Sequence, residues 1–412
     1  MESGNAAVHD ILIIGGGLVG ASLAIALEAT GLDVGLVEAA ASDALPAVFD
    51  ERNLSLAEAT VNALGALGVL RHLRAPGGSI ERIHVSRRGD FGRVVLRASD
   101  YGRREFGRVV VARDFGGALE ARLAELPRLH RYRPARFDGF DGESGDARAA
   151  RLVLPDGSRR VVRARLMVAA DGSHSAARSA LGIDVDTHHY GQTLLIARLR
   201  AAQPPDGTAY ERFGTEGPTA LLPRGDRHFG LVHAVAREHA DEVAALDDGA
   251  FLSRAQEAFG WRVGRFLACG PRGRYPAVRS VARSLTAPRA VLVGNAAQTV
   301  HPIGAQGFNL GLRDALTLAE LIDGERRSSP GPDVGAAGLL ERYAALREED
   351  RRRTLAFSDG LVRLTAREEA WLSPLRGLGL LAADRLGSLQ GALVGGAMGY
   401  RGHVPALCRG EQ

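Results

Sequence analysis

A glycine-rich turn near the N-terminus, placed between a short apolar run and a helix-forming segment, constrains the fold more than any other feature. The run His9 to Ile14 leads into Gly15-Gly16-Gly17-Leu18-Val19-Gly20, and good helix formers follow from Ala21 to Thr30. A second apolar run, Val34 to Val37, ends at Glu38, 23 residues after Gly15. Strand, tight turn, helix and strand in this order predict a parallel βαβ unit, the start of a Rossmann-type α/β domain.

The glycines of this turn have separate physical roles. Gly15 permits the tight turn, Gly17 lets the backbone approach a pyrophosphate, and Gly20 lets the helix pack closely on the strand. The helix N-terminus then faces the phosphates, and the Glu38 carboxylate can accept both hydroxyls of an adenosine ribose. We therefore expect a dinucleotide to contact this segment, through Gly15, Gly17, Leu18, Val19, Gly20 and Glu38.

A second cluster, Ala169-Ala170-Asp171-Gly172-Ser173-His174, follows the apolar run Leu166 to Val168. A strand that ends in Asp-Gly brings an acid and a tight turn to the carboxyl end of the strand, where α/β sheets bind ligands. The same residues also suit an ordinary turn with a helix cap, so both interpretations stay open here.

The third cluster, which runs from Gly294 to Asp314 after the apolar run Val291 to Val293, is the most specific of the three. Its small residues admit a planar ligand close to the backbone, and Pro302 fixes the chain direction before a helix. We expect that helix to begin near Gln306 or Gly307, where its partial positive charge favours an anion.

Composition and charge exclude several classes of protein. All 52 basic residues are Arg, and 48 acidic residues leave a net charge of +4, too small to indicate a nucleic-acid partner. Cys269 and Cys408 belong to no metal-binding or disulfide pattern, which favours a reducing cytoplasm and no metal. Neither a signal peptide nor a run of about 20 apolar residues is present, so we expect no membrane span. Surface attachment stays open.

Apolar periodicity predicts the other elements of a chain whose length indicates two or three domains. Helices are expected over 55–75, 115–126, 306–324 and most of the chain from about 335. Strands are expected within 80–111 and within 131–170, with a turn at Pro155-Asp156-Gly157. The stretch 185–280 shows broken alternation, and 326–332 is expected to be a loop. The run Asp350-Arg351-Arg352-Arg353 is interpreted as a solvated helix face, with a partner site as the alternative.

The three clusters, in this order and over most of the chain, resemble the aromatic-ring hydroxylase group of FAD-dependent monooxygenases. The third cluster is most similar to the ubiquinone-biosynthesis hydroxylases, and among them to the 2-octaprenyl-6-methoxyphenol hydroxylases. The run from Asp50 to Leu56 is similar to the family's early Asp-x-Arg segment, and Ala397-Met398-Gly399 resembles its C-terminal end. Many relatives carry Gly-Asp where this chain has Gly294-Asn295, a variant that points to the methoxyphenol branch. Gly304-Ala305 departs from the Ala-Gly order expected there.

The resemblance implies an α/β fold like that of para-hydroxybenzoate hydroxylase. A discontinuous FAD-binding domain would take residues 1–78, 109–180 and 281–345. A sheet-rich substrate domain would take residues 79–108 and 181–280. Residues 346–412 would form a helical C-terminal region.

The resemblance also implies roles for residues in each cluster. Gly15, Gly17 and Gly20 would hold the FAD pyrophosphate, and Glu38 would hold the adenosine ribose. Further FAD contacts would come from Arg52, Arg113, Asp171, Gly172, Gly294, Asn295, Pro302, Gly304, Gln306, Gly307, Phe308 and Asn309. Of these, Arg52 and Arg113 would lie along the pyrophosphate and ribityl side, and Asp171 and Gly172 would support nicotinamide docking. The candidate catalytic residues, taken from the flavin loop, are His301, Pro302 and Gln306.

The implied activity is hydroxylation of a polyprenylated phenol ring in ubiquinone biosynthesis through a flavin C4a-hydroperoxide. O2 would be the co-substrate, and NAD(P)H would bind transiently as the reductant. Hydroxylation of a soluble aromatic compound and a noncatalytic flavin-fold scaffold are the alternatives. The protein is expected in the cytoplasm. Peripheral contact with the inner face of the membrane and association with other ubiquinone-biosynthesis enzymes stay open, as does the oligomeric state.

Overall fold

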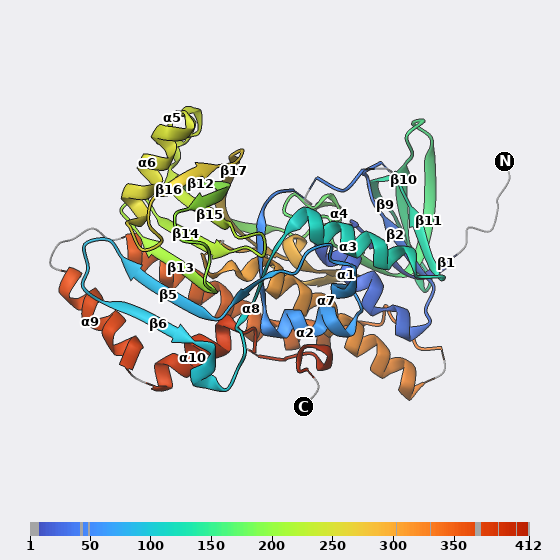
Figure 1. The fold of residues 1–412 in the computed structure, drawn as a ribbon. Coiled ribbons are helices and arrows are strands. Elements are labelled where there is room, and N and C mark those ends of the chain that lie inside the picture. The colour runs from blue at the N-terminus through green and yellow to red at the C-terminus, as the bar shows by residue number, and fades with distance from the viewer. Residues whose placement is uncertain are drawn as a thin grey trace.

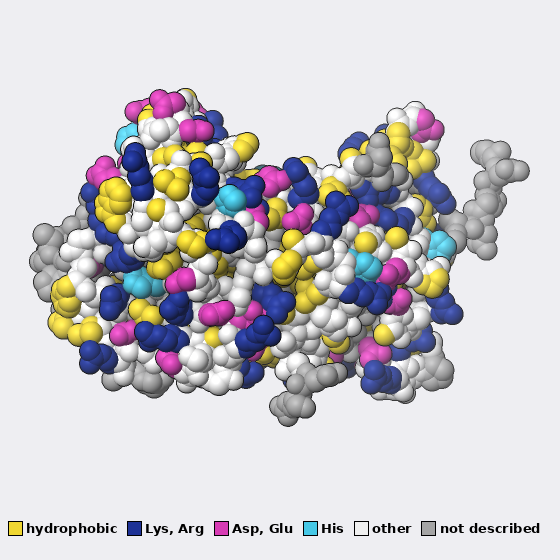
Figure 2. Space-filling model, in the orientation of Figure 1, with side chains coloured by type: hydrophobic (Ala, Val, Ile, Leu, Met, Phe, Trp, Pro, Cys, Tyr) yellow, Lys and Arg dark blue, Asp and Glu magenta, His cyan; other side chains and the backbone are white. Residues whose placement is uncertain are grey.

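The computed structural model describes residues 8–41, 44–47, 50–301, 303–329, 331–366, 372–385, 387–400 and 402–410. Figure 1 shows two large sheets at opposite ends of the molecule, with helices α2 and α7 between them and helices α9 and α10 beside the sheet on the left. Figure 2 shows a notch in the upper outline between these two ends. Basic and acidic side chains are interspersed over the face shown there.

The first sheet is built around the predicted βαβ unit, which the structure confirms. β1 (Val8–Ile14), α1 (Leu18–Ala26) and β2 (Val34–Val37) follow one another, and β1 pairs in parallel with β2. The sheet order is β18-β19-β11-β1-β2-β8, with β9 and β10 attached through β11. These strands are β8 (Leu129–Tyr132), β9 (Arg136–Ser144), β10 (Ala147–Val153), β11 (Arg159–Ala169), β18 (Thr286–Ala287) and β19 (Ala290–Leu292). β2 and β19 are fully buried, and so is β1 from Ile11 to Ile14, as expected for parallel strands covered on both faces.

The second sheet has the order β20-β17-β12-β15-β14-β13-β5-β6, and β16 pairs with β12. Its strands are β5 (Arg82–Arg87), β6 (Arg93–Arg97), β12 (Val185–Ala201), β13 (Thr208–Phe213), β14 (Pro218–Pro223), β15 (Phe229–Ala236), β16 (Phe266–Cys269), β17 (Gly273–Ala282) and β20 (Gln298–Thr299). Two helices that the broken alternation did not predict, α5 (Ala240–Ala245) and α6 (Asp248–Phe259), cover one face of this sheet. Phe251 and Phe259 of α6 pack there against Phe229 and Leu231 of β15.

A third, small sheet joins the two larger ones and corrects one prediction. Its order is β3-β7-β4, with β3 (Asn53–Ala57), β4 (Gly78–Ile80) and β7 (Gly107–Val111). Residues 55–57, expected to start a helix, belong to β3, and α2 (Glu58–Ala66) begins after them. The helix therefore begins three residues later than the apolar periodicity predicted.

The starts of the remaining helices agree with the pattern in part: α7 begins at the predicted residue, whereas α3 begins three residues before the predicted Phe115. α3 (Ala112–Ala124) covers β1 and β2 together with α1, and α4 (Ala176–Ala180) follows the second cluster. α7 (Gln306–Ser328) begins where predicted but continues through residues 326–328, which were expected to be a loop. α8 (Ala337–Ala366), α9 (Leu372–Arg385) and α10 (Gly387–Ala397) make the described C-terminal part mostly helical, as predicted. The domain boundaries themselves stay a prediction.

A buried ion-pair network between α7 and α8 contradicts the expected solvated helix face. Asp350 is fully buried and accepts hydrogen bonds from Arg313 Nε at 2.6 Å and from Arg347 Nη2 at 2.8 Å. Arg347 Nε also donates to Asp314 Oδ1 at 2.7 Å. Only the later part of the run, Arg352 and Arg353, is exposed.

Candidate functional site

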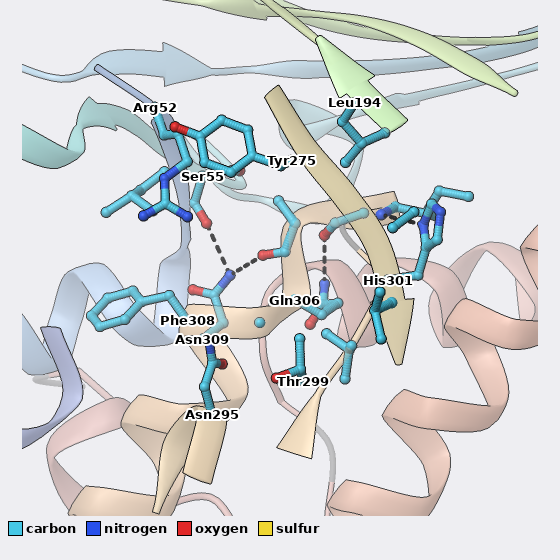
Figure 3. A pocket seen from close by; sticks show the side chains of 18 of the residues that line it. Arg52, Ser55, Leu194, Tyr275, Asn295, Thr299, His301, Gln306, Phe308 and Asn309 are labelled. Carbon is cyan, nitrogen blue, oxygen red and sulfur yellow. Dashed lines mark hydrogen bonds between the residues drawn. The ribbon is translucent and has the colours of Figure 1, made fainter. Parts of the chain in front are cut away.

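One continuous cavity of about 2100 Å³ joins the three glycine-rich clusters to a face of the second sheet. The clusters follow β1, β11 and β19, which are neighbours in the first sheet, so their turns meet at the carboxyl ends of parallel strands. Figure 3 shows part of the cavity, with Arg52 and Ser55 on one side, Leu194 and Tyr275 above, and the third cluster below.

The glycine turn after β1 has the geometry that the sequence predicted. Gly15 has a φ of +105°, which favours glycine, and a Cβ on Gly20 would lie 1.9 Å from the Gly15 carbonyl oxygen. Gly15, Gly17, Leu18 and Val19 line the cavity, whereas Gly20 does not. Gly20 therefore serves the close packing of α1 on β1.

Glu38 stands at the end of β2 with its carboxylate fixed by two backbone donors. Gly16 N donates to Oε2 at 2.9 Å, and Ala40 N donates to Oε1 at 2.7 Å. Glu38 lines the cavity. A carboxylate oxygen keeps lone pairs after one such bond, so Glu38 can still accept hydrogen bonds from hydroxyl groups.

The second cluster combines both interpretations of its sequence. Asp171 Oδ2 accepts a hydrogen bond from Ala177 N at 3.0 Å, and Ser175 caps α4 by accepting one from Arg178 N at 2.8 Å. Asp171 and Gly172 also line the cavity. A Cβ built on Gly172 would meet no atom within 4 Å, so the chain leaves open space at this turn for a ligand.

The third cluster lies against the cavity along most of its length. Asn295, Gly304, Gln306, Gly307, Phe308 and Asn309 line it, and so does Thr299; their contact with a planar ligand stays a prediction. Gly294 does not line the cavity; a Cβ there would meet Val19 at 2.9 Å. Pro302, predicted both to bind the cofactor and to act in catalysis, lies outside the described residues.

Asn309 uses its whole amide to tie the third cluster to β3. Its Oδ1 accepts a hydrogen bond from Ala57 N at 2.9 Å. Its Nδ2 donates to Ser55 O and to Ala305 O, each at 2.9 Å (Figure 3). Gln306 Nε2 donates to Gly304 O at 3.0 Å, so both amides hold the turn before α7.

Asp314 supports the cluster from behind, and it was not among the predicted site residues. Its Oδ2 accepts hydrogen bonds from Gly294 N at 3.1 Å and from Gln298 Nε2 at 2.6 Å, while Oδ1 binds Arg347. Because Asp314 is buried, this arrangement fixes the backbone at the start of the cluster.

His301 is a buried imidazole at the start of the turn before α7. Ile303 N donates to Nδ1 at 3.2 Å, and Nε2 lies 3.4 Å from Gln192 Oε1. Burial lowers the pKa of His301 to about 4, although the charge of Asp359 acts in the opposite direction. His301 holds the loop through these contacts and also lines the cavity, so its catalytic role stays a prediction.

Arg52 reaches the cavity through a cluster that joins the start of β3 to β17. Arg52 Nε donates to Asp50 Oδ1 at 2.9 Å, and the Tyr275 hydroxyl donates to Asp50 Oδ2 at 2.7 Å. The Arg52 guanidinium lies 4.8 Å from the centre of the Tyr275 ring. Arg113, by contrast, does not line the cavity, and its guanidinium pairs with Glu51 at 2.8 Å.

A group of three side chains that could bind a metal ion lies outside the cavity, and the sequence did not predict it. His9, Asp33 and His130 bring ligand atoms within 4.8 Å of one another at the amino ends of β1, β2 and β8. None of them lines the cavity. Asp33 Oδ1 lies 3.0 Å from His9 Nδ1, and the Tyr132 hydroxyl lies 2.6 Å from His9 Nε2.

Comparison with known proteins gives the family. The model of the FAD binding domain matches residues 8–353. The chain is 34% identical over 405 residues to the ubiquinone hydroxylase UbiL of Rhodospirillum rubrum, with 95% of this chain and 90% of that protein covered. It is 28% identical to the 3-demethoxyubiquinol 3-hydroxylase of Escherichia coli, with 92% and 96% covered.

Solved structures support the fold. The p-nitrophenol 4-monooxygenase PnpA of Pseudomonas putida superposes with a TM-score of 0.78 at 14% identity, over 96% of this chain and 99% of that one. The cavity left open at Gly172, together with the glycine turn and Glu38, fits FAD. This chain belongs to the family of FAD-dependent monooxygenases of ubiquinone biosynthesis.

Proposed function

We propose that this protein hydroxylates the ring of a polyprenylated phenol in ubiquinone biosynthesis, with NAD(P)H as the reductant and O2 as the co-substrate. The observation that carries the proposal is the single cavity of about 2100 Å³, which has a polar and an apolar part. The relatives named as ubiquinone hydroxylases support the same substrate class.

The polar part of the cavity suits FAD. Glu38 would receive the adenosine ribose, and the turn after Gly15 would receive the pyrophosphate. The turn before α7 would hold the flavin ring, with the positive end of the helix near any negative charge on it. When bound, FAD would pass electrons from NAD(P)H to O2 and so activate the oxygen, and the chain binds the phenol and excludes water.

The apolar part suits a hydrocarbon tail. It lies between β5, β6 and the C-terminal helices, and α9 is attached to β6 through a hydrogen bond from Val95 N to Asp384 Oδ1 at 2.9 Å. Its lining residues are Ile80, Ile83, Val94, Leu96, Phe106, Leu380 and Ala397. Such a surface stabilises an isoprenoid chain by about 0.8 kcal/mol for each CH2 group that it removes from water.

An apolar patch next to this part of the cavity would contact the membrane that holds the substrate. Phe91, Leu378 and Leu381 are exposed by 67%, 54% and 38% around the β5–β6 turn and α9. Hydrophobic atoms are visible over α9 at the lower left of Figure 2. None of the helices within the described ranges is both long and apolar enough to cross a membrane.

The experiment that tests the proposed function is substrate-stimulated NAD(P)H oxidation with product analysis. We expect the FAD-loaded protein to oxidise NAD(P)H faster with a prenylated phenol than with a water-soluble benzoate, and to form a hydroxylated phenol. Preference for the benzoate would favour a soluble aromatic substrate. A protein that binds FAD but hydroxylates neither compound would contradict the proposal and favour a scaffold role.

A further inference from the structure

Glu211 places one carboxyl group on the apolar sheet face that forms a wall of the cavity. Ala209, Glu211 and Phe213 alternate along β13 and all line the cavity. Of the residues between them, Tyr210 also lines the cavity, whereas Arg212 points the other way and its Nη1 donates to Phe259 O at 2.7 Å on the side of α6. The accessible part of the Glu211 side chain therefore faces the cavity and not the outer surface.

The strand register surrounds Glu211 with apolar residues. Val85 lies opposite it on β5 and Ala220 on β14, and the same row continues through Val232 and Ile196. All five residues line the cavity, and Glu211 is the ionisable one among them.

The adjacent row along these strands meets the third cluster. Phe213, two residues after Glu211, packs against Ile303 of that cluster. Two residues of a strand span about 6.6 Å. Glu211 therefore lies about this distance along β13 from Phe213, the residue that contacts the flavin loop.

No described group of the protein satisfies the Glu211 carboxyl. It makes no hydrogen bond or ion pair within the described ranges. Arg87, which lies opposite Phe213 on β5, pairs with Asp90 at 3.7 Å. Facing positions on β14 and the C-terminal helices, such as Leu222 and Leu380, are apolar. Burial raises the pKa of Glu211 to about 7.

An ionisable side chain in such a place is costly for the fold. An unpartnered carboxyl costs stability when it leaves water, and the described structure offers no compensating contact. A carboxyl with a shifted pKa that faces a cavity is typical of a functional group.

We propose that Glu211 binds the ring hydroxyl of the phenol and accepts its proton during oxygen transfer. This inference rests on the proposed function. The O–H bond breaks, its proton passes to the carboxylate, and the electron pair stays on the ring oxygen, which makes the ring a better nucleophile. One atom of O2 then forms a bond to a ring carbon as the O–O bond breaks, and the other atom leaves as water. The C–H bond at that carbon breaks and its proton is released as the ring regains aromaticity, while the proton held by Glu211 returns to the original phenol oxygen. The net reaction remains phenol, O2, NAD(P)H and H+ going to hydroxylated phenol, water and NAD(P)+.

The test compares the wild-type holoenzyme with Glu211→Gln, which keeps the shape of the side chain but cannot accept the proton. We expect unchanged FAD content and a loss of about 10²-fold or more in kcat/KM for the prenylated phenol. Wild-type activity should rise with pH through about 7 as the carboxyl ionises, and this rise should be absent in the variant. Glu242→Gln, on the exposed face of α5, is the matched control and should behave as wild type.

Two outcomes would overturn the inference while leaving the proposed function intact. One is a Glu211→Gln enzyme with wild-type kcat/KM and the same pH profile. The other outcome concerns Glu211→Asp, which is used if Glu211→Gln does not fold. This variant keeps the carboxyl but retracts it, so we expect the wild-type pH profile with a lower kcat/KM. Full activity of Glu211→Asp would refute the proposed role of Glu211. A wild-type enzyme that hydroxylates no phenol would instead refute the proposed function.

Discussion

The buried network around Asp350 gives the sharpest prediction on stability. Asp350 is fully buried, and its carboxylate accepts hydrogen bonds from Arg313 Nε and Nη2 at 2.6 and 3.0 Å, from Arg347 Nη2 at 2.8 Å and from Thr354 Oγ1 at 3.2 Å. Burial alone would raise the pKa of Asp350, but the two guanidinium groups lower it. Asp350→Asn keeps the volume and removes the charge, so both cations remain buried without their shared partner.

Breaking a buried ion pair on one side costs about 3–5 kcal/mol, a large share of a typical folding free energy of about 5–15 kcal/mol. For a chain of 412 residues, an unfolding entropy of about 0.9 kcal/mol/K converts this loss into a Tm lower by about 3–6 °C. We expect both shifts for the FAD-loaded Asp350→Asn variant, in urea titration and in thermal unfolding.

The matched control for this variant lies one residue away on the same helix. Glu349 pairs with Arg353 at 2.6 Å, but both side chains are about half exposed. Glu349→Gln should therefore change the unfolding free energy by only about 0.3–0.5 kcal/mol. A loss below about 1 kcal/mol in Asp350→Asn, or equal losses in both variants, would refute the reasoning.

Three further predictions concern the cavity and its support. Gly20→Ala places a Cβ 1.9 Å from the Gly15 carbonyl oxygen, so the purified protein should lack flavin absorbance; a fully loaded variant would contradict this. Asn309→Ala removes three hydrogen bonds and leaves buried backbone groups unpaired, which should lower the unfolding free energy by about 2–4 kcal/mol in urea titration. Burial lowers the pKa of His233 to about 4, so its neutral form stabilises the fold above about pH 6.5, and this stability is lost as the pH falls towards 4. His233→Gln should reduce the slope of stability against pH in that window by about 1.4 kcal/mol per unit, and an unchanged slope would speak against it.

The parts of the fold that depend on local sequence were predictable. The turn from Gly15 to Gly20, the strand ends at Glu38 and Asp171, and the start of α7 at Gln306 each follow from the residues at those positions. These segments meet at one cavity because each follows a strand of the same parallel sheet, and such sheets bind ligands at the carboxyl ends of their strands.

What the sequence did not show depends on contacts between distant residues. Asp314 and Arg347 are 33 positions apart and belong to different helices, so charge patterning along one helix could not identify their pairing. Tyr275 and Asp50 meet across 225 positions. Glu211 became informative only when the strand register placed it among apolar neighbours. A carboxylate in a strand normally indicates a face exposed to solvent, but the face of β13 that carries Glu211 forms a wall of the cavity.

Monooxygenation is tested by following isotopically labelled O2 through a single turnover with FAD, NAD(P)H and a prenylated phenol. We expect one labelled atom in the hydroxylated ring and the other in water. A ring hydroxyl without label, or label found only in hydrogen peroxide, would contradict it.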